Sequence, residues 1–355
     1  MSLRGTASPN PLSRTALRPT GLSVLRNPPL AALISSNMFT SLGGSMQLLL
    51  HGWLAVQWGH SLWMLAALGA TRILPKLLGA VPAGILCDRL PRTRVLAATR
   101  GAAVVASLVP LLGFVAPFPL LWVLAASSIG GAVHALDLPA GRGTLGDVSE
   151  PADLDAAVAF NSAGGHFAAL VGPLIAFGLA SWPGRPAALI ASGAVLATAA
   201  VLSRRIPDLM PRRKAVADGV RPLVRYLRSA PTATLLILVG VAPVLVDKAI
   251  ALGLPSKAGG GASVGFALAA PEVGGLLAAG VLAIAPRRLG VGAIAAAGVL
   301  YAVFVFAAAQ NLREGEVLIV MLAAAGVAKL VMIATAQARL QGIVPPSVRG
   351  RVFAL

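Results

Sequence analysis

The segment Gly84 to Arg94 reads Gly-Ile-Leu-Cys-Asp-Arg-Leu-Pro-Arg-Thr-Arg and decides how the rest of the chain is interpreted. Four of its residues are charged, and it lies between two long apolar stretches. It also contains Pro91, which a helix interior disfavours. Each flanking stretch approaches or exceeds the roughly 20 residues that a helix needs to cross a bilayer. The segment therefore predicts a tight hairpin that joins two membrane-spanning helices.

The composition places the whole chain in a membrane. Hydrophobic residues make up 57% of the chain and charged residues 12%, whereas a soluble domain carries about 25% charged residues. Cys87 is the single cysteine, which excludes an intramolecular disulfide and a multi-cysteine metal site. We expect an all-α membrane protein with ten spans, over residues 30–56, 61–86, 95–117, 119–140, 156–181, 186–203, 230–250, 262–285, 289–310 and 317–341.

The basic residues lie mostly on one side of the predicted membrane. Of the 29 Lys and Arg residues, only Arg185, Lys257 and Arg313 fall in loops of the opposite side. The positive-inside rule then places the N-terminus in the cytoplasm. Arg100 is counted with the cytoplasmic group. The net charge of +17 is explained in this way without nucleic acid. Residues 1–29 have no apolar core of their own and predict a cytoplasmic tail.

The chain divides into two similar parts. We expect a six-helix bundle over 30–203, a basic cytoplasmic linker over 204–229 and a second bundle over 230–355. The segment Gly280–Gly290 is a weaker copy of the Gly84–Arg94 hairpin, and such internal repeats are typical of secondary transporters. The second part is shorter by about two helices. It predicts a C-terminal bundle without most of an eleventh span and without a twelfth.

Three segments carry a resemblance to a known family. The pattern Gly-x-x-x-Asp-Arg-x-Gly-Arg-Arg is matched by Gly84, Asp88, Arg89 and Arg92, with Pro91 in place of the second glycine and Arg94 supplying a further cation. The segment 344–352 and the fifth span, through Asn161, Gly172 and Pro173, match less strictly. The chain resembles the major facilitator superfamily, and within it the bacterial efflux branch that includes the enterobactin exporter.

The resemblance implies a helix arrangement. Helices one, four, seven and ten would line a cavity, two, five, eight and eleven would join the halves, and three, six and nine would face lipid. Asp88 would accept hydrogen bonds from Arg92 or from a helix N-terminus, and Gly84 would allow another backbone to approach. Ion pairs that form in only one state would then bias a two-state motion. The alternative is a set of positive-inside arginines with a capping aspartate.

Several charged residues fall inside the predicted spans, where ionisable groups are functional candidates by default. Arg72, Lys76, Glu272 and Lys329 lie near mid-membrane, and we assign them, with Asp247, to the substrate or proton pathway. The excess of cations predicts a cavity for an anionic substrate, with Glu272 as counter-ion or proton carrier. Arg72 can instead be structural. Asp247 falls close to the outer end of its span, where it and Lys248 can instead snorkel to the interface.

No pattern for catalysis or a cofactor accompanies these charges. His51, His134 and His166 lack metal-ligand spacing and predict helix–helix hydrogen bonds, and neither a Walker A motif nor a Ser/His/Asp arrangement is found. We therefore expect no enzyme, no cofactor and no metal. The expected function is proton-driven export of a small molecule by a monomer in the inner membrane, through alternating access. The alternatives are an importer of the same fold and a transport-incompetent remnant or membrane interaction protein.

Overall fold

The computed structural model describes residues 26–59, 62–150, 154–182, 184–208, 221–257, 262–284, 290–312 and 315–344. These residues are almost entirely helical, without a strand. The helices are α1 (Pro28–Gly59), α2 (Leu62–Arg89), α3 (Arg92–Leu108), the 3₁₀ turn η2 (Val109–Phe114), α4 (Pro119–Val148), α5 (Leu154–Ser181), α6 (Arg185–Ser203), α7 (Arg221–Ser229), α8 (Pro231–Lys257), α9 (Ala262–Ile284), α10 (Val291–Gln310) and α11 (Gly315–Ile343). A helix covers each of the ten expected spans, so the predicted fold class is confirmed.

Glycine and proline set many of the helix boundaries. Pro119 and Pro186 occupy the first turns of α4 and α6, where the missing N–H costs nothing. Gly184 precedes α6 with φ 105°, a conformation that glycine adopts without strain. The basic segment between the two halves, expected to be a cytoplasmic linker, contains the short helix α7. Helix α7 ends at Ser229, two residues before α8 begins at Pro231.

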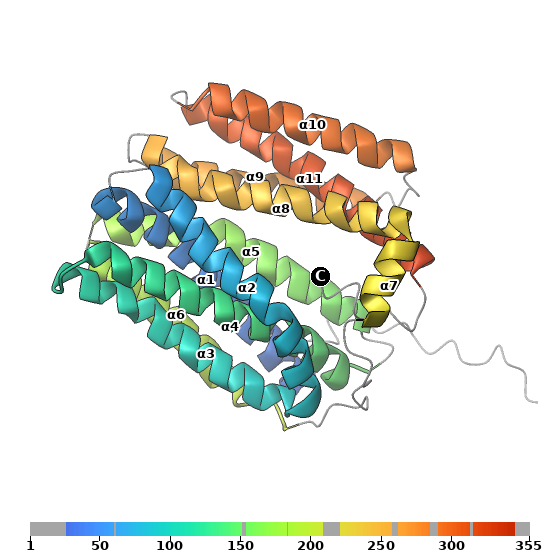
Figure 1. Cartoon of the computed structure of the whole chain (residues 1–355), viewed down its shortest axis with the longest axis horizontal. Coiled ribbons are helices and arrows are strands. Elements are labelled where there is room, and N and C mark those ends of the chain that lie inside the picture. The colour runs from blue at the N-terminus through green and yellow to red at the C-terminus, as the bar shows by residue number, and fades with distance from the viewer. Residues whose placement is uncertain are drawn as a thin grey trace, which may run out of the picture.

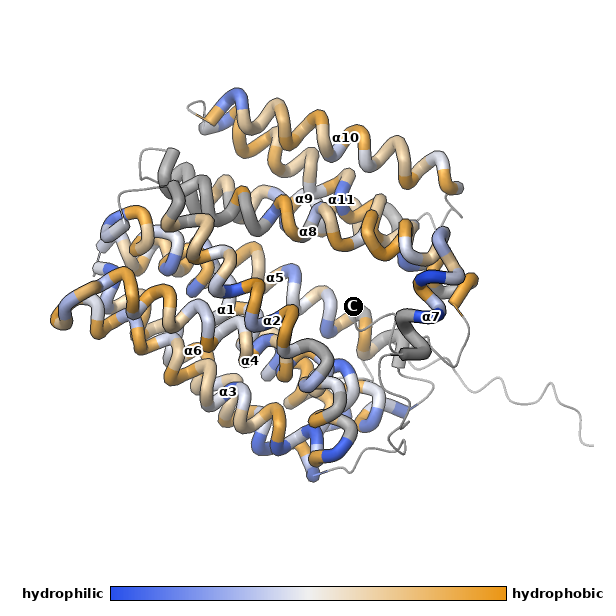
Figure 2. The backbone as a smooth tube through the Cα atoms, in the orientation of Figure 1, coloured by the Kyte–Doolittle hydropathy of each residue, from blue (hydrophilic) through white to orange (hydrophobic). Residues whose placement is uncertain are grey.

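The surface of the helices is suited to lipid. Six helical segments within the described ranges are long and apolar enough to cross a membrane: Arg92–Phe114, Pro119–Val148, Phe160–Ser181, Arg185–Ser203, Val291–Gln310 and Gly315–Gln337. Large apolar side chains such as Leu78, Val105 and Phe306 are exposed on them and on α2. Figure 2 shows hydrophobic residues along the lengths of the helices and hydrophilic ones gathered near α7 and the adjacent helix ends. The protein is a multi-pass membrane protein.

The helices form two halves. In the first half, α1 packs on α5 and α6, α2 on α4, and α3 on α4 and α6, whereas in the second half α11 packs on α8, α9 and α10. Contacts between the halves join α5 to α9, and α1 and α2 to α8. In Figure 1, α3 and α6 lie at one edge of the molecule and α10 at the opposite edge. The expected lipid-facing helices are therefore the outermost ones.

The two ends of the bundle differ in how the halves meet. We call the end at which α1 and α8 begin the linker end, and the opposite end the far end. At the far end one hydrophobic cluster includes Met46, Leu50 and Leu68 of the first half and Leu318 and Leu322 of the second. The clusters at the linker end each belong to one half, for example Leu30, Leu33 and Leu96 in one and Ala233 and Leu340 in another. Hydrophobic packing therefore joins the halves at the far end.

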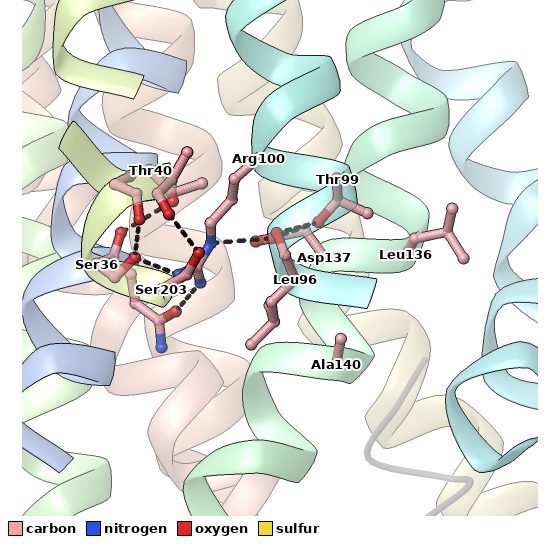
Figure 3. A network of polar contacts seen from close by, with 12 residues as sticks. Ser36, Thr40, Leu96, Thr99, Arg100, Leu136, Asp137, Ala140 and Ser203 are labelled. Carbon is pink, nitrogen blue, oxygen red and sulfur yellow. Dashed lines mark hydrogen bonds and ion pairs between the residues drawn. The ribbon is translucent and has the colours of Figure 1, made fainter. Parts of the chain in front are cut away.

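A buried ion pair holds the helices of the first half together. The side chain of Arg100 on α3 is 0% exposed, and its Nε lies 3.3 Å from Oδ1 of Asp137 on α4. Arg100 also donates to Ser36 and, at 2.5 Å, to Asn37 on α1, while Thr99 donates to Asp137 at 3.0 Å. Figure 3 shows the guanidinium between Ser36 on one side and Asp137 on the other. The network fixes α3 to α1 and α4.

The sequence interpretation did not predict the burial of Arg100 or its pairing with Asp137. Arg100 was grouped with the cytoplasmic cations because it lies near the start of an expected span. In the structure α3 begins at Arg92, and α4 continues through Pro139 to Val148. Arg100 therefore lies two turns inside its helix, where α4 provides a carboxylate for it.

Removing the carboxylate of Asp137 tests this network. The change Asp137→Ala leaves the buried guanidinium of Arg100 without its counter-charge, which costs about 3–5 kcal/mol. We expect a clearly lower midpoint of thermal unfolding for the purified protein in detergent. The exposed carboxylate of Asp208 is the control, since Asp208→Ala should leave the midpoint unchanged. Equal midpoints for Asp137→Ala and the parent chain would contradict this role.

Candidate functional site

Five polar side chains from five helices meet in the middle of the bundle. Asp247 lies on α8, Glu272 on α9, Tyr301 on α10, Lys329 on α11 and His166 on α5. Each lies at least two helical turns from either end of its helix. All five are therefore deep in the membrane if the helices cross it. We call these five residues the central cluster.

An ammonium group lies between two carboxylates in the central cluster. The Nζ of Lys329 is 2.5 Å from Oδ2 of Asp247 and 3.7 Å from Oε1 of Glu272. The Tyr301 hydroxyl donates to Oδ1 of Asp247 at 2.8 Å. On the other side of the cluster, Nδ1 of His166 is 2.9 Å from Oε2 of Glu272. The Lys329 side chain is only 12% exposed, so its charge depends on these partners.

The central cluster contains two carboxylates and one ammonium group. Asp247 and Glu272 carry two negative charges when ionised, and Lys329 supplies one positive charge. A proton held between His166 and Glu272 makes the sum zero. An imidazole nitrogen and a carboxylate oxygen at this distance can share a proton in a hydrogen bond.

The His166–Glu272 contact lies between the two halves. His166 belongs to α5 in the first half, and Glu272 belongs to α9 in the second. These two helices pack against each other. A motion that separates α5 from α9 must therefore lengthen or replace the His166–Glu272 hydrogen bond.

The structure corrects the expected place of Asp247. The sequence interpretation ended its span at residue 250, close to the outer interface. In the structure α8 continues to Lys257, so Asp247 lies about 24 Å along the helix from Pro231. Asp247 is therefore in the central cluster and pairs with Lys329, which makes two carboxylates instead of one. The side chain of Lys248 is outside the described residues.

His166 and Tyr301 were not predicted as site residues. A helix–helix hydrogen bond was expected for His166, but its partner Glu272 was not. Tyr301 was not singled out. No spacing in the sequence identifies this group, because its members come from five helices. The single signal was the presence of charged residues within apolar stretches, which identified Glu272 and Lys329.

Arg72 and Lys76 lie outside the central cluster. They are one turn apart on α2, in the first half. Among the described residues, no carboxylate lies within ion-pair distance of either. Lys329 is neutralised by its partners, so these two residues provide the uncompensated positive charge that the sequence suggested.

The hairpin after α2 ties parts of the first half together. Nη1 of Arg92 lies 2.7 Å from Oδ2 of Asp147 at the end of α4. The Nε of Arg94 lies 3.0 Å from Oδ2 of Asp208, and the Thr93 hydroxyl donates to Oδ1 of the same carboxylate. These hydrogen bonds, first from Thr93 and then from Arg94, hold the pKa of Asp208 below its usual value. The start of α3 is thus connected to α4 and to the segment after α6.

The remaining hairpin residues take no part in these described contacts. Arg89 is exposed, and the side chain of Asp88 is outside the described residues. A Cβ at Gly84 would meet open space. Among the described residues, none makes the close backbone approach expected at Gly84.

The fifth-helix motif packs α5 against α1. Nδ2 of Asn37 donates to Oδ1 of Asn161 at 2.7 Å. A Cβ at Gly172 would collide with Ser45 on α1, so only glycine fits there without a shift. Pro173 is buried beside it. None of the three contacts the central cluster through a described hydrogen bond.

A substitution series at Lys329 tests the electrostatics of the central cluster. The change Lys329→Gln leaves two carboxylates without their cation, and we expect the free energy of unfolding to fall by about 3–5 kcal/mol. Adding Asp247→Asn should recover part of this loss, since a neutral amide needs no counter-charge. Thermal unfolding of the single and double variants in detergent measures the coupling. Strictly additive losses would rule out the proposed pairing.

Comparisons with known proteins agree with the geometry. The family model described as Major Facilitator Superfamily matches residues 30–355. No curated protein matches the chain significantly. Among solved structures, a bacterial homolog to the human lysosomal transporter Spinster, inward-facing and unoccupied, has a TM-score of 0.62 at 15% identity, over 91% of this chain and 77% of that one.

Two further structures are similar to the same degree. The nucleoside transporter NupG has a TM-score of 0.64 at 14% identity, over 92% of this chain and 86% of that one. A POT family transporter in complex with 5-aminolevulinic acid has a TM-score of 0.65 at 9% identity, over the same two shares. At these identities the likeness shows the fold alone.

Proposed function

The chain belongs to the Major Facilitator Superfamily, and from this premise we propose that it is a proton-driven exporter of a small anionic molecule. Membership in this transporter family, together with the multi-pass fold, indicates that the chain is a small-molecule transporter. Proton coupling, direction and substrate charge are the parts that we propose. Transport would proceed by alternating access, with the two halves rocking about a site between them.

The observation that carries the proposal is the hydrogen bond between His166 and Glu272. It joins the two halves and pairs an imidazole with a carboxylate, two groups that can share a proton. Loss of that proton would add negative charge beside Lys329. The free energy of protonation would then depend on the relative positions of α5 and α9. Proton binding would therefore be coupled to the rocking of the halves.

Direction and location are supported by the sequence. The positive-inside rule makes the linker end cytoplasmic, in the inner membrane. The far end, where hydrophobic packing joins the halves, is then the outer side. Export is supported by the resemblance of the fifth helix and the hairpin to the efflux branch. We further propose a monomer, because both halves of one chain build the central cluster.

Neutralising Glu272 tests proton coupling. A screen of siderophores and drugs in proteoliposomes with an imposed pH gradient first identifies a transported compound. With that compound, Glu272→Gln should abolish gradient-driven accumulation, because the amide cannot carry the proton. Exchange without a gradient should persist, since it needs no net proton movement.

The control for this variant is Glu316→Gln. Glu316 lies in the first turn of α11 at the far end, away from the central cluster. Proteoliposomes with the Glu316→Gln variant should accumulate the compound at the same rate as those with the parent chain. Gradient-driven accumulation by Glu272→Gln at the parent rate would overturn the coupling role of Glu272.

Transport direction has a separate test. Inside-out vesicles should accumulate the compound when their lumen is acidic, because their interior corresponds to the outside of the cell. Accumulation by right-side-out vesicles alone would instead establish an importer.

A further inference from the structure

A second group of polar side chains lies between α1 and α2, apart from the central cluster. Gln47 and His51 are one turn apart on α1, and they are 6% and 2% exposed. Neither ring nitrogen of His51 has a hydrogen-bond partner among the described residues, and neither does Nε2 of Gln47. Buried polar groups without partners are rare in native proteins, and a ligand that supplies the partner is one explanation for them.

Arg72 and Lys76 bring positive charge to the same region. Helices α1 and α2 are in contact. The backbone of Arg72 packs tightly against Gly131 of α4, where a Cβ would collide with its carbonyl. The position of α2 is therefore fixed. The cations are held in place by helix packing and by no described carboxylate.

These side chains can all donate hydrogen bonds. The guanidinium of Arg72 can bind both oxygens of a carboxylate, and the ammonium of Lys76 adds a point charge. The Nε2 amide of Gln47 is a donor, and the imidazole of His51 offers an N–H. A neutral or cationic ligand would leave two positive charges uncompensated. A carboxylate would balance one of them and satisfy the unpartnered donors.

We infer that Gln47, His51, Arg72 and Lys76 form the binding site for a carboxylate group of the substrate. The inference rests on the proposed function and assigns its substrate site to the first half of the molecule. Arg72 lies about 15 Å along α2 from Leu62, at mid-membrane. Substrate and proton would then bind mainly to opposite halves, with the proton at the central cluster. In this arrangement the substrate and the proton would each influence the contact between the halves from a separate site.

Equilibrium binding to the purified full chain tests the site without a pH gradient. The midpoint of thermal unfolding is measured with benzoate, glutarate and citrate at constant ionic strength, and with benzamide as the neutral counterpart of benzoate. We expect at least one carboxylate to raise the midpoint saturably and benzamide to leave it unchanged. In the double variant Arg72→Gln/Lys76→Gln, the apparent affinity should fall roughly 30-fold or more.

The control removes the same net charge elsewhere. Arg204 and Arg205 are exposed after α6, and Arg204→Gln/Arg205→Gln should bind like the parent chain. Arg72→Lys is a second, conservative variant, which keeps the charge and loses the bidentate geometry. It should bind with intermediate affinity, and this readout remains if the double variant does not fold.

The outcomes separate this inference from the proposed function. Saturable stabilisation that is lost in the Arg72 and Lys76 variants and kept in the control supports the carboxylate site. No stabilisation by any of the three carboxylates, or equal affinity in the Arg72→Lys and parent chains, overturns it. Intact carboxylate binding without gradient-driven transport would overturn proton coupling and leave the carboxylate site standing.

Discussion

The free-energy cost of burying charged side chains away from water is the constraint on which the rest of this structure depends. Backbone groups are satisfied within the helices, but each ionised side chain needs a partner from another helix. Arg100 and Lys329 meet this need in similar ways. Each is a nearly inaccessible cation with a carboxylate on a neighbouring helix, Asp137 for one and Asp247 for the other.

The two cations differ in what their networks connect. The described partners of Arg100 lie on helices of the first half, so its network holds that half rigid. The cluster around Lys329 extends through Glu272 to His166 in the other half. A rigid network within one half and a polar contact between the halves suit the rocking motion that we propose. The hydrophobic core shared at the far end adds a reason for the halves to stay together there.

The sequence predicts the helices well and their polar contacts less well. Apolar stretches separated by glycine, proline and charge locate ten spans, because a membrane helix must be continuous and apolar. Glu272 and Lys329 were found because a charge within such a stretch is conspicuous. Asp247 was misplaced because helix α8 extends past its most apolar part. The pairing of Arg100 was missed because a cation near a helix end looks like a positive-inside residue.

Other features depend on three-dimensional packing and leave no local signal. His166 acquires its role from Glu272, which lies on a helix far along the chain. Gly172 matters because Ser45 lies against it, while Gly84, which belongs to a more recognisable motif, has no such neighbour in this conformation. A motif therefore identifies the family, whereas packing determines which of its residues touch.

The central claim is that protonation of the His166–Glu272 contact moves the two halves relative to each other. Spin labels at Glu150→Cys in the first half and Gly290→Cys in the second, with Cys87→Ser, place one label on each half at the linker end. Their distance distribution can be measured at about pH 8.5 and at about pH 5.5, on either side of the ordinary pKa of a histidine side chain. We predict a shift between two populations that His166→Gln removes. A distribution that does not change with pH, or that shifts equally with His166→Gln, would contradict the claim.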